Sequence, residues 1–245
     1  MADGLKQSIQ LITFDLDNTL WETDPIIYRA EQASYDALIA AHPDIASLYT
    51  LEGVRQYKSD LAECYPSLVH QVSKIRFETL RRIALQAGLF GDEAERIAQI
   101  AFDAFYHERS QVTPFEQAFE KLEQLSEIYS LIALTNGNAD LEMIGIHHLF
   151  DAHYNGEEIG AAKPAPDMFE AALKKAGVEA RQAVHVGDHP EQDIQAARDL
   201  GFHTIWVNVL GKEWPQELQP ADISINHLSE LPTAIEHLGN SLANS

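Results

Sequence analysis

Two aspartates near the start of the chain have the types and spacing for acid–base or nucleophilic chemistry. Asp15 and Asp17 directly follow an apolar stretch and are separated by one residue. Two carboxylates on backbone that leaves a strand can face one pocket and do different work. One attacks as a nucleophile or binds a metal, and the other holds a proton for a leaving group. The alternative is a simple turn or helix cap, for which aspartate is also favoured.

Three further polar groups follow along the chain, each beside the end of an expected strand or the start of an expected helix. They are Thr135 with Asn136, Lys163 before a proline, and Asp188 with Asp193 five residues later. A hydroxyl and free backbone N–H groups can bind phosphate oxygens, and carboxylates can collect around a hard cation. Taken singly, each group also fits a cap, a turn or a solvated charge. Their common order is therefore the informative feature.

The elements that must position these groups alternate between strand and helix. Apolar runs predict strands at residues 8–14, 130–135, 183–187, 203–209 and, more weakly, 222–226. Helical patterns at 114–127, 141–149, 166–176 and 190–200 lie between them. This alternation predicts an α/β fold with a doubly wound, Rossmann-like parallel sheet, in which ligands bind beyond the carboxyl ends of the strands.

One long segment interrupts the alternation. From about residue 25 to residue 110 the apolar spacing is helical throughout, with helices expected near 26–38, 51–61, 67–88 and 92–109. We therefore expect an α/β core made of residues 1–22 and 111–245, with an inserted all-helical cap domain at residues 23–110.

Composition limits the classes of partner. The 245 residues carry a formal net charge of −21, which disfavours binding to nucleic acids or to anionic membranes. An anionic substrate would need local positive charge, and a bound divalent cation supplies it. No apolar run is long enough to span a membrane, and the first residues lack the pattern of a signal peptide. With a single cysteine, Cys64, we expect a cytoplasmic protein without disulfides.

The combined motifs resemble the haloacid dehalogenase superfamily of phosphohydrolases. The resemblance rests on the aspartate pair, the threonine after the second strand, the Lys-Pro pair and the Gly-Asp-x-x-x-x-Asp run, in that order. It covers essentially the whole chain, because the helical insertion looks like the type-one cap of that superfamily. Residues 14–20, 70–80 and 134–140 further resemble bacterial phosphatases that act on flavin mononucleotide and on phosphoribityl intermediates of riboflavin synthesis.

The resemblance implies roles for the aspartates. Asp15 resembles the nucleophile that forms an aspartyl-phosphate. Asp17 resembles the acid that protonates the leaving alcohol and then activates water. Asp188 looks like a ligand of Mg²⁺, which it would share with the Asp15 carboxylate and the carbonyl oxygen of Asp17.

It also implies roles for the residues around them. Thr135 and Lys163 look like ligands of the phosphate oxygens, with Asn136 adding backbone contacts. Asp193 is expected to orient Lys163 or a metal-bound water, and Thr19 to fix the bend after the first strand. The substrate would be a small phosphorylated metabolite, bound by a monomer or a weak dimer.

Alternatives remain open at the level of substrate and class. Nucleotides and sugar phosphates are alternative substrates. A 2-haloacid dehalogenase is disfavoured, because such enzymes lack the second aspartate. A catalytically idle binding module is disfavoured, because none of the motif residues is missing. The cap is expected to set specificity, with Trp21, Arg29, His70 and Arg76 as candidates. Each of these four also fits simple packing or ion pairing.

Overall fold

The computed structural model describes residues 9–68 and 70–243 and divides into two compact units. The α/β unit comprises Met1–Glu22, Thr113–Gly137 and Gly145–Ser245. The helical unit comprises Thr23–Val112 and Asn138–Ile144. The second of these segments was not expected in the helical unit. It is tied there by Asn138, whose Nδ2 donates to Oγ of Ser73 over 3.0 Å.

The α/β unit is built on a parallel sheet of six strands in the order β3-β2-β1-β4-β5-β6. The strands are β1 (Leu11–Phe14), β2 (Ser130–Thr135), β3 (Ala152–Asn155), β4 (Ala183–Gly187), β5 (His203–Val207) and β6 (Ile223–Ile225). The doubly wound α/β prediction is confirmed. The strand order reverses direction at β1, which has β2 on one side and β4 on the other.

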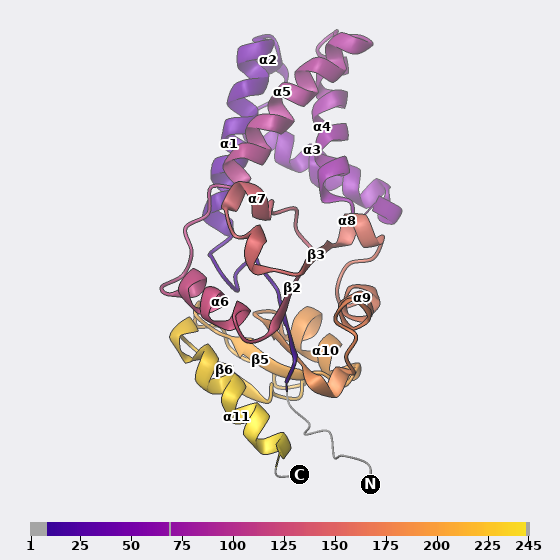
Figure 1. Cartoon of the computed structure of the whole chain (residues 1–245). Helices are drawn as coiled ribbons and strands as arrows, with labels where there is room; N and C mark the ends of the chain where they lie inside the picture. Colours follow the sequence, from indigo (N-terminus) through magenta and orange to yellow (C-terminus); the bar gives the residue numbers. More distant parts are fainter. Residues whose placement is uncertain (1–8, 69, 244–245) are drawn as a thin grey trace. The chain divides into compact units, whose positions relative to one another are not determined.

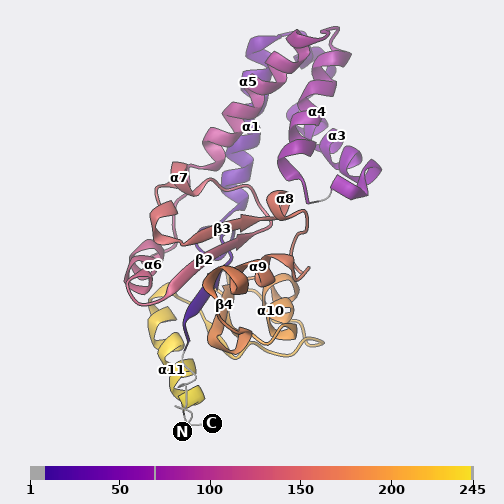
Figure 2. The ribbon, with the colours of Figure 1, turned by 45° about the vertical axis from the view of Figure 1, so that its right-hand side comes forward.

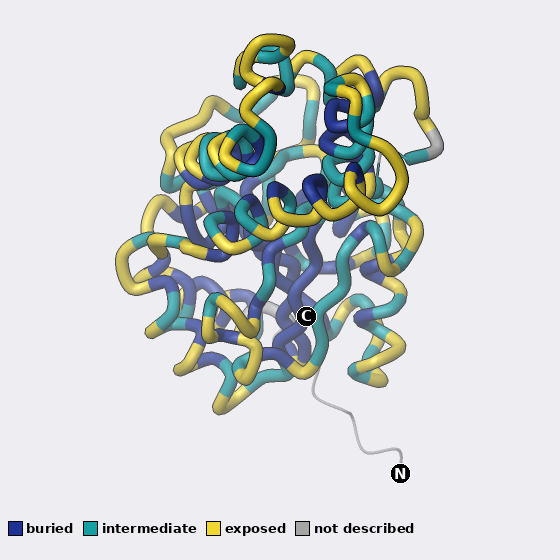
Figure 3. Tube along the Cα trace, turned by 90° about the horizontal axis from the view of Figure 1, so that it is seen from above, coloured by how far each residue is buried: buried dark blue, intermediate teal, exposed yellow. Residues whose placement is uncertain are grey.

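Helices cover both faces of this sheet (Figures 1 and 2). The helical elements of the α/β unit are α6 (Ala118–Ser126), η2 (His147–Leu149), α8 (Gly156–Ile159), α9 (Asp167–Ala176), η3 (Ala180–Gln182), η4 (Pro190–Gln195), α10 (Ala196–Asp199), η5 (Leu228–Glu230) and α11 (Leu231–Ala243). Met168 and Phe169 of α9 and Ala197 of α10 join Leu11 and Ile132 of the sheet in one buried core. Strands covered on both faces are mostly apolar, and the central strands of this sheet are buried, as Figure 3 shows.

Strand β3 was not expected from the sequence. Its residues Ala-His-Tyr-Asn are all half-buried, and it forms an edge of the sheet. An edge strand has one pairing side and a partly solvated surface, so it carries neither a continuous apolar run nor a clear alternation. The sequence signal was correspondingly absent.

The helical unit packs four longer helices together. They are α1 (Asp24–Ala41), α3 (Leu51–Cys64), α4 (Val72–Gln86) and α5 (Asp92–Arg109), joined by α2 (Ile45–Leu48) and η1 (Pro66–Leu68), with α7 (Leu141–Ile144) added from the later segment. Their shared core includes Leu38, Leu80, Ile83 and Ile97. The expected helix at 67–88 is shorter than predicted: its first residues belong to η1, so α4 begins only at Val72, and it ends at Gln86, shortly before Gly88, whose φ of +88° is a conformation that ends helices. Within the described part of the chain, no helix has both the length and the apolar character to cross a membrane.

Candidate active site

Three of the four sequence-predicted aspartates, Asp15, Asp188 and Asp193, meet at the carboxyl end of the sheet, at the point where strand order reverses. Asp15 directly follows β1, and its N–H donates to the carbonyl of Val186 in β4 over 2.9 Å. Asp188 directly follows β4, and Thr135 is the last residue of β2. Ligands of doubly wound sheets bind in this crevice. The parallel register therefore brings together residues that are more than 170 positions apart.

Asp15 is buried and both of its carboxylate oxygens are held. Lys163 Nζ lies 2.7 Å from Oδ1, and the Thr19 hydroxyl donates to Oδ2 over 2.9 Å. Burial raises the pKa of Asp15 to about 8, and the nearby carboxylates of Asp193 and Asp188 add to this, against the lowering effect of Lys163. The cluster thus holds more negative charge than its one buried lysine balances, which favours a bound cation.

Lys163 is fixed between two carboxylates. Its Nζ lies 2.6 Å from Oδ1 of Asp193 as well as 2.7 Å from Asp15. Burial alone would lower the pKa of Lys163, but the charges of the two aspartates outweigh it and raise that pKa. The ammonium group therefore stays charged inside the protein, beside the candidate nucleophile.

The backbone of Lys163 is positioned by the side-chain amide of Asn136. The Lys163 N–H donates to Asn136 Oδ1 over 2.7 Å, and Asn136 Nδ2 donates back to the Lys163 carbonyl over 2.9 Å. The sequence suggested backbone contacts from Asn136 to a phosphate, which stays a prediction, and the structure adds that the Asn136 side chain holds the backbone of Lys163. The Thr135 hydroxyl accepts from the N–H of Gly137 over 2.9 Å, which bends the chain after β2.

Asp193 approaches the end of β4 closely. A Cβ added to Gly187 would lie 2.5 Å from both Cβ and Cγ of Asp193, so only glycine fits at that position. Asp193 belongs to the π-helical turn η4, and its Oδ2 accepts from the backbone N–H of His189 over 2.9 Å. Burial alone would raise the pKa of Asp193, but the charge of Lys163 and the hydrogen bond from His185 outweigh it and lower that pKa. An ionised Asp193 is therefore available to orient Lys163.

Sequence reasoning missed the residues beneath Asp193. His185 in β4 is fully buried, with Nε2 3.3 Å from Asp193 Oδ1 and Nδ1 2.8 Å from the Thr13 hydroxyl. Thr13 and His185 are direct neighbours in the parallel register of β1 and β4. In the sequence both residues are inside strand-like runs, where they look like core positions.

Three carboxylates are close enough to share a metal ion. One oxygen each from Asp15, Asp188 and Asp193 lies within 4.8 Å of the others. An all-oxygen set of this kind suits Mg²⁺. Both Asp193 oxygens already accept hydrogen bonds, from Lys163 and His189, whereas the Asp188 carboxylate accepts from Lys212 through Oδ2 over 2.6 Å. Burial raises the pKa of Asp188, as expected for a carboxylate gathered with others.

Asp17 and Trp21 form a local pair. The indole Nε1 of Trp21 donates to Oδ1 of Asp17 over 3.0 Å. Trp21 itself is fully buried and packs edge-on against Phe119 in α6. In the structure Trp21 therefore supports the Asp17 carboxyl from the core. This arrangement weighs against the expectation that it contacts substrate.

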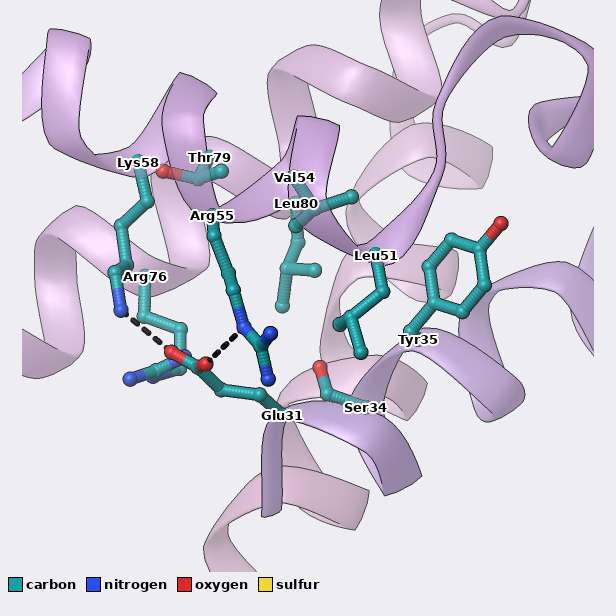
Figure 4. Close-up of a pocket in the computed structure, with 10 residues that line it drawn as sticks. All are labelled: Glu31, Ser34, Tyr35, Leu51, Val54, Arg55, Lys58, Arg76, Thr79 and Leu80. Carbon is teal, nitrogen blue, oxygen red and sulfur yellow. Dashed lines mark hydrogen bonds and ion pairs between the residues drawn. The ribbon is translucent and has the colours of Figure 1, made fainter. Parts of the chain in front are cut away.

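The other specificity candidates belong to the helical unit. Arg29 is exposed and donates to the carbonyl of Gln111 over 2.9 Å, and His70 is half-buried just before α4. Arg76 is largely buried, with its guanidinium 3.5 Å from the ring centroid of Phe105 and Nη1 3.4 Å from Glu31. Figure 4 shows Arg76 in a small pocket with Lys58 and Arg55 around Glu31. That pocket, of about 20 Å³, has room for roughly one water.

Comparison with known proteins agrees with this architecture. The family model of haloacid dehalogenase-like hydrolases matches residues 9–201. The Escherichia coli K12 protein YigB, a 5-amino-6-(5-phospho-D-ribitylamino)uracil phosphatase, is 31% identical over 93% of this chain and 96% of its own. The Escherichia coli K12 pyrimidine 5'-nucleotidase YjjG is 27% identical over 90% of this chain and 95% of its own. A structure described as a 2-haloacid dehalogenase from Pseudomonas syringae has a TM-score of 0.88 and 38% identity, covering 94% of this chain and 99% of its own.

Proposed function

Because this chain belongs to the haloacid dehalogenase-like hydrolases and is a phosphoric monoester hydrolase of that family, we propose that it is an Mg²⁺-dependent phosphatase working through an aspartyl-phosphate. The observation that carries the proposal is the state of Asp15, which is buried at the switch point of the sheet with Lys163 2.7 Å from its Oδ1. A carboxylate held in place beside a fixed cation is suited to attack a phosphate ester.

The proposed reaction has two steps. A carboxylate oxygen of Asp15 bonds to phosphorus while the bond from phosphorus to the leaving oxygen breaks, and Asp17 gives its proton to that oxygen. The ionised Asp17 then takes a proton from a water that attacks the aspartyl-phosphate, which restores both carboxyl groups and releases inorganic phosphate. The hydrogen bond from Trp21 supports this role, because it fixes the Asp17 carboxyl without neutralising it.

Lys163 and Thr135 are the proposed ligands of the phosphate oxygens, with the backbone of Asn136 beside them. The charge on Lys163 offsets the negative charge of the transferred group, which in phosphoryl transfer matters more than covalent chemistry. The clasp from Asn136 and the ion pair with Asp193 support this role by fixing both ends of the lysine. Thr19 is proposed to hold the Asp15 carboxylate in one rotamer.

Asp15 and Asp188 are the proposed side-chain ligands of Mg²⁺, with the carbonyl oxygen of Asp17 as a third. The raised pKa of Asp15 and the oxygen atoms gathered within 4.8 Å fit a cation in this place. When bound, Mg²⁺ offsets the repulsion between the Asp15 carboxylate and an anionic substrate. Asp193 is left out of the ligand set, because its oxygens already accept hydrogen bonds from Lys163 and the His189 backbone.

The proposed substrates are flavin mononucleotide or a phosphoribityl intermediate of riboflavin synthesis. Similarity to YigB over most of both chains supports the phosphoribityl compound, and flavin mononucleotide is proposed only because residues 14–20, 70–80 and 134–140 resemble phosphatases of that subgroup. Nucleotides are the second candidate, supported by the similarity to YjjG. The dehalogenase description of the Pseudomonas syringae structure favours a haloacid substrate, and Asp17 argues against it, since a halide leaving group needs no proton. A cytoplasmic location and a monomer or weak dimer stay predictions.

A substrate panel tests the proposal. Phosphate release should be measured with flavin mononucleotide, a phosphoribityl compound, nucleotides and glyceraldehyde 3-phosphate, and halide release with 2-chloropropionate, each with Mg²⁺ and with a chelator. Asp15→Asn serves as the inactive control, because an amide does not attack phosphorus. We expect phosphate release that needs both Mg²⁺ and Asp15. Faster release of halide than of phosphate, or full phosphatase activity in the chelator, would contradict it.

A further inference from the structure

Two lysines in the α/β unit are held by the same device. The Lys212 N–H donates to Oδ1 of Asn208 over 2.7 Å, and Asn208 Nδ2 donates to the Lys212 carbonyl over 3.0 Å. This repeats the clasp that Asn136 makes with Lys163. In each case an asparagine amide pairs with the backbone of a lysine, so the start of the lysine side chain is fixed.

The two lysines also point at the two proposed metal-binding carboxylates. Lys163 Nζ lies 2.7 Å from Asp15, and Lys212 Nζ lies 2.6 Å from Oδ2 of Asp188. The Asp188 backbone is fixed as well, because its carbonyl accepts from the indole Nε1 of Trp206 over 2.8 Å. The ammonium of Lys212 thus neutralises one of the carboxylates that a divalent cation would need.

The two ion pairs, Lys163–Asp15 and Lys212–Asp188, differ in how far the lysine is buried. The Lys163 side chain is 1% exposed and has Asp193 as a second partner, so it cannot leave. The Lys212 side chain is 44% exposed, while Asp188 is only 8% exposed. A half-exposed lysine can turn its charge into water at little cost, because the ammonium keeps its hydration there. Lys163 is therefore a permanent part of the cluster, and Lys212 is a displaceable one.

We propose that Lys212 is a built-in counter-ion of Asp188 that competes with the divalent cation for this carboxylate and so sets the cation affinity of the site. The inference rests on the proposed Mg²⁺ requirement. Without a cation, Lys212 removes the cost of an unpaired carboxylate that is almost buried. Binding of the cation must break this pair, so part of the binding free energy is spent on releasing the lysine.

The test is Mg²⁺ binding measured by calorimetry without substrate, supported by thermal unfolding in Mg²⁺ and in a chelator. Lys212→Met should bind Mg²⁺ more tightly, with a Kd lower by roughly two- to fivefold, the range for a partly exposed ion pair. Its melting temperature should fall in the chelator and recover in Mg²⁺. Lys175→Met, at an exposed lysine of α9, removes the same charge elsewhere and should change the Kd less.

Asn208→Ala distinguishes the effect of the Lys212–Asp188 ion pair from the effect of the protein's net charge, which this variant leaves unchanged. It keeps the lysine but removes both bonds of the clasp, so its Kd should also fall, though less than in Lys212→Met. Wild-type binding of Mg²⁺ tests the proposed function, and the difference between variants tests this inference. An unchanged or weaker affinity in Lys212→Met, or an equal gain in Lys175→Met, would overturn it. An unchanged Mg²⁺ affinity with a raised KM for an aryl phosphate would make Lys212 a phosphate ligand instead.

Discussion

Nε2 of His185 lies 3.3 Å from Oδ1 of Asp193 in the interior of the α/β unit. A carboxylate only accepts hydrogen bonds, so the favourable tautomer carries its proton on Nε2 and leaves Nδ1 to accept from the Thr13 hydroxyl, 2.8 Å away. Burial lowers the pKa of His185, which keeps the ring neutral. Thr13 and His185 thereby hold Asp193, and Asp193 holds Lys163 over 2.6 Å.

The first prediction concerns this support. His185→Phe keeps a ring against Phe169 but removes the donor to Asp193, so kcat/KM for an aryl phosphate should fall by roughly ten- to a hundredfold, the range for one hydrogen bond to a charged group. His185→Gln restores an N–H donor and should recover part of the loss. The ¹⁵N shifts of His185 should report the Nε2–H tautomer in wild type. An Nδ1–H tautomer, or equal activity of the Phe and Gln variants, would contradict this role.

The second prediction uses two glycines with opposite surroundings. Gly187→Ala places a methyl group 2.5 Å from Asp193, which must shift and take Lys163 with it. We expect a loss of about 1–3 kcal/mol in unfolding free energy together with a fall in kcat. Gly239→Ala is the matched control, because a Cβ there meets nothing within 4 Å and lies in helix α11, where alanine is favoured. Chemical denaturation and steady-state kinetics of both variants measure the unfolding free energy and kcat. If Gly187→Ala had the stability and kcat of wild type, the close contact with Asp193 would be refuted.

The third prediction tests the acid. Asp17→Asn should slow esters with poor leaving groups by roughly 10²–10⁴-fold, the usual range for general acid catalysis. Esters of acidic phenols should suffer less in the first step, because their leaving oxygen needs little protonation. Single-turnover rates for a series of aryl and alkyl phosphates give the comparison. Equal slowing across the series would remove Asp17 from the acid role, whereas a steeper dependence on leaving-group pKa would support it.

The sequence was most informative where a strand is covered on both faces. Strands β2 and β4 have the bounds expected from their apolar runs, and the polar residues at their ends, Thr135 and Asp188, lie at the same edge of the sheet. In a parallel sheet covered on both faces, polar residues that follow the strands lie in the crevice at the carboxyl ends. The fold class alone therefore predicts that the motif residues lie close together.

The residues that position the catalytic side chains could not be predicted from the sequence in the same way. Thr13 and His185 meet because of a register between strands 172 residues apart, and neither has a local signal. Lys212 stands in a loop where most lysines are simply solvated. Its partner Asp188 is set by tertiary geometry, and the Asn208 clasp has no sequence pattern of its own. Residues that act by positioning a neighbour depend on which side chains meet in the fold, and the hydrophobic periodicity of a sequence does not predict those contacts.

Glu31 in α1 gathers three cations of the helical unit. Its carboxylate lies 2.7 Å from Arg55 and from Lys58 and 3.4 Å from Arg76. Figure 4 shows the pairs with Arg55 and Lys58 as dashed lines. Burial alone would raise the pKa of Glu31, but the hydrogen bond and charge of Lys58, with those of the arginines, outweigh it and lower that pKa. A group whose pKa is lower in the folded state stabilises that state above its unfolded pKa and loses this effect as the pH falls through the folded value.

The last prediction follows from that sign. Glu31→Gln keeps the shape of the side chain but leaves three neighbouring cations without their shared anion. At pH 7 the helical unit should lose roughly 2–4 kcal/mol of stability, since breaking a largely buried ion pair costs more than breaking an exposed one. The difference in stability between Glu31→Gln and wild type should shrink as the pH falls below the ordinary range of glutamate, because wild-type Glu31 then becomes neutral too.

Amide hydrogen exchange in α1, α3 and α4, at pH 7 and at acid pH, measures the stability of the helical unit without requiring both units to unfold together. Glu93→Gln, at an exposed pair with Arg96 in α5, is the control and should change little. A gap that persists unchanged at acid pH would show that Glu31 acts through packing and not through its charge.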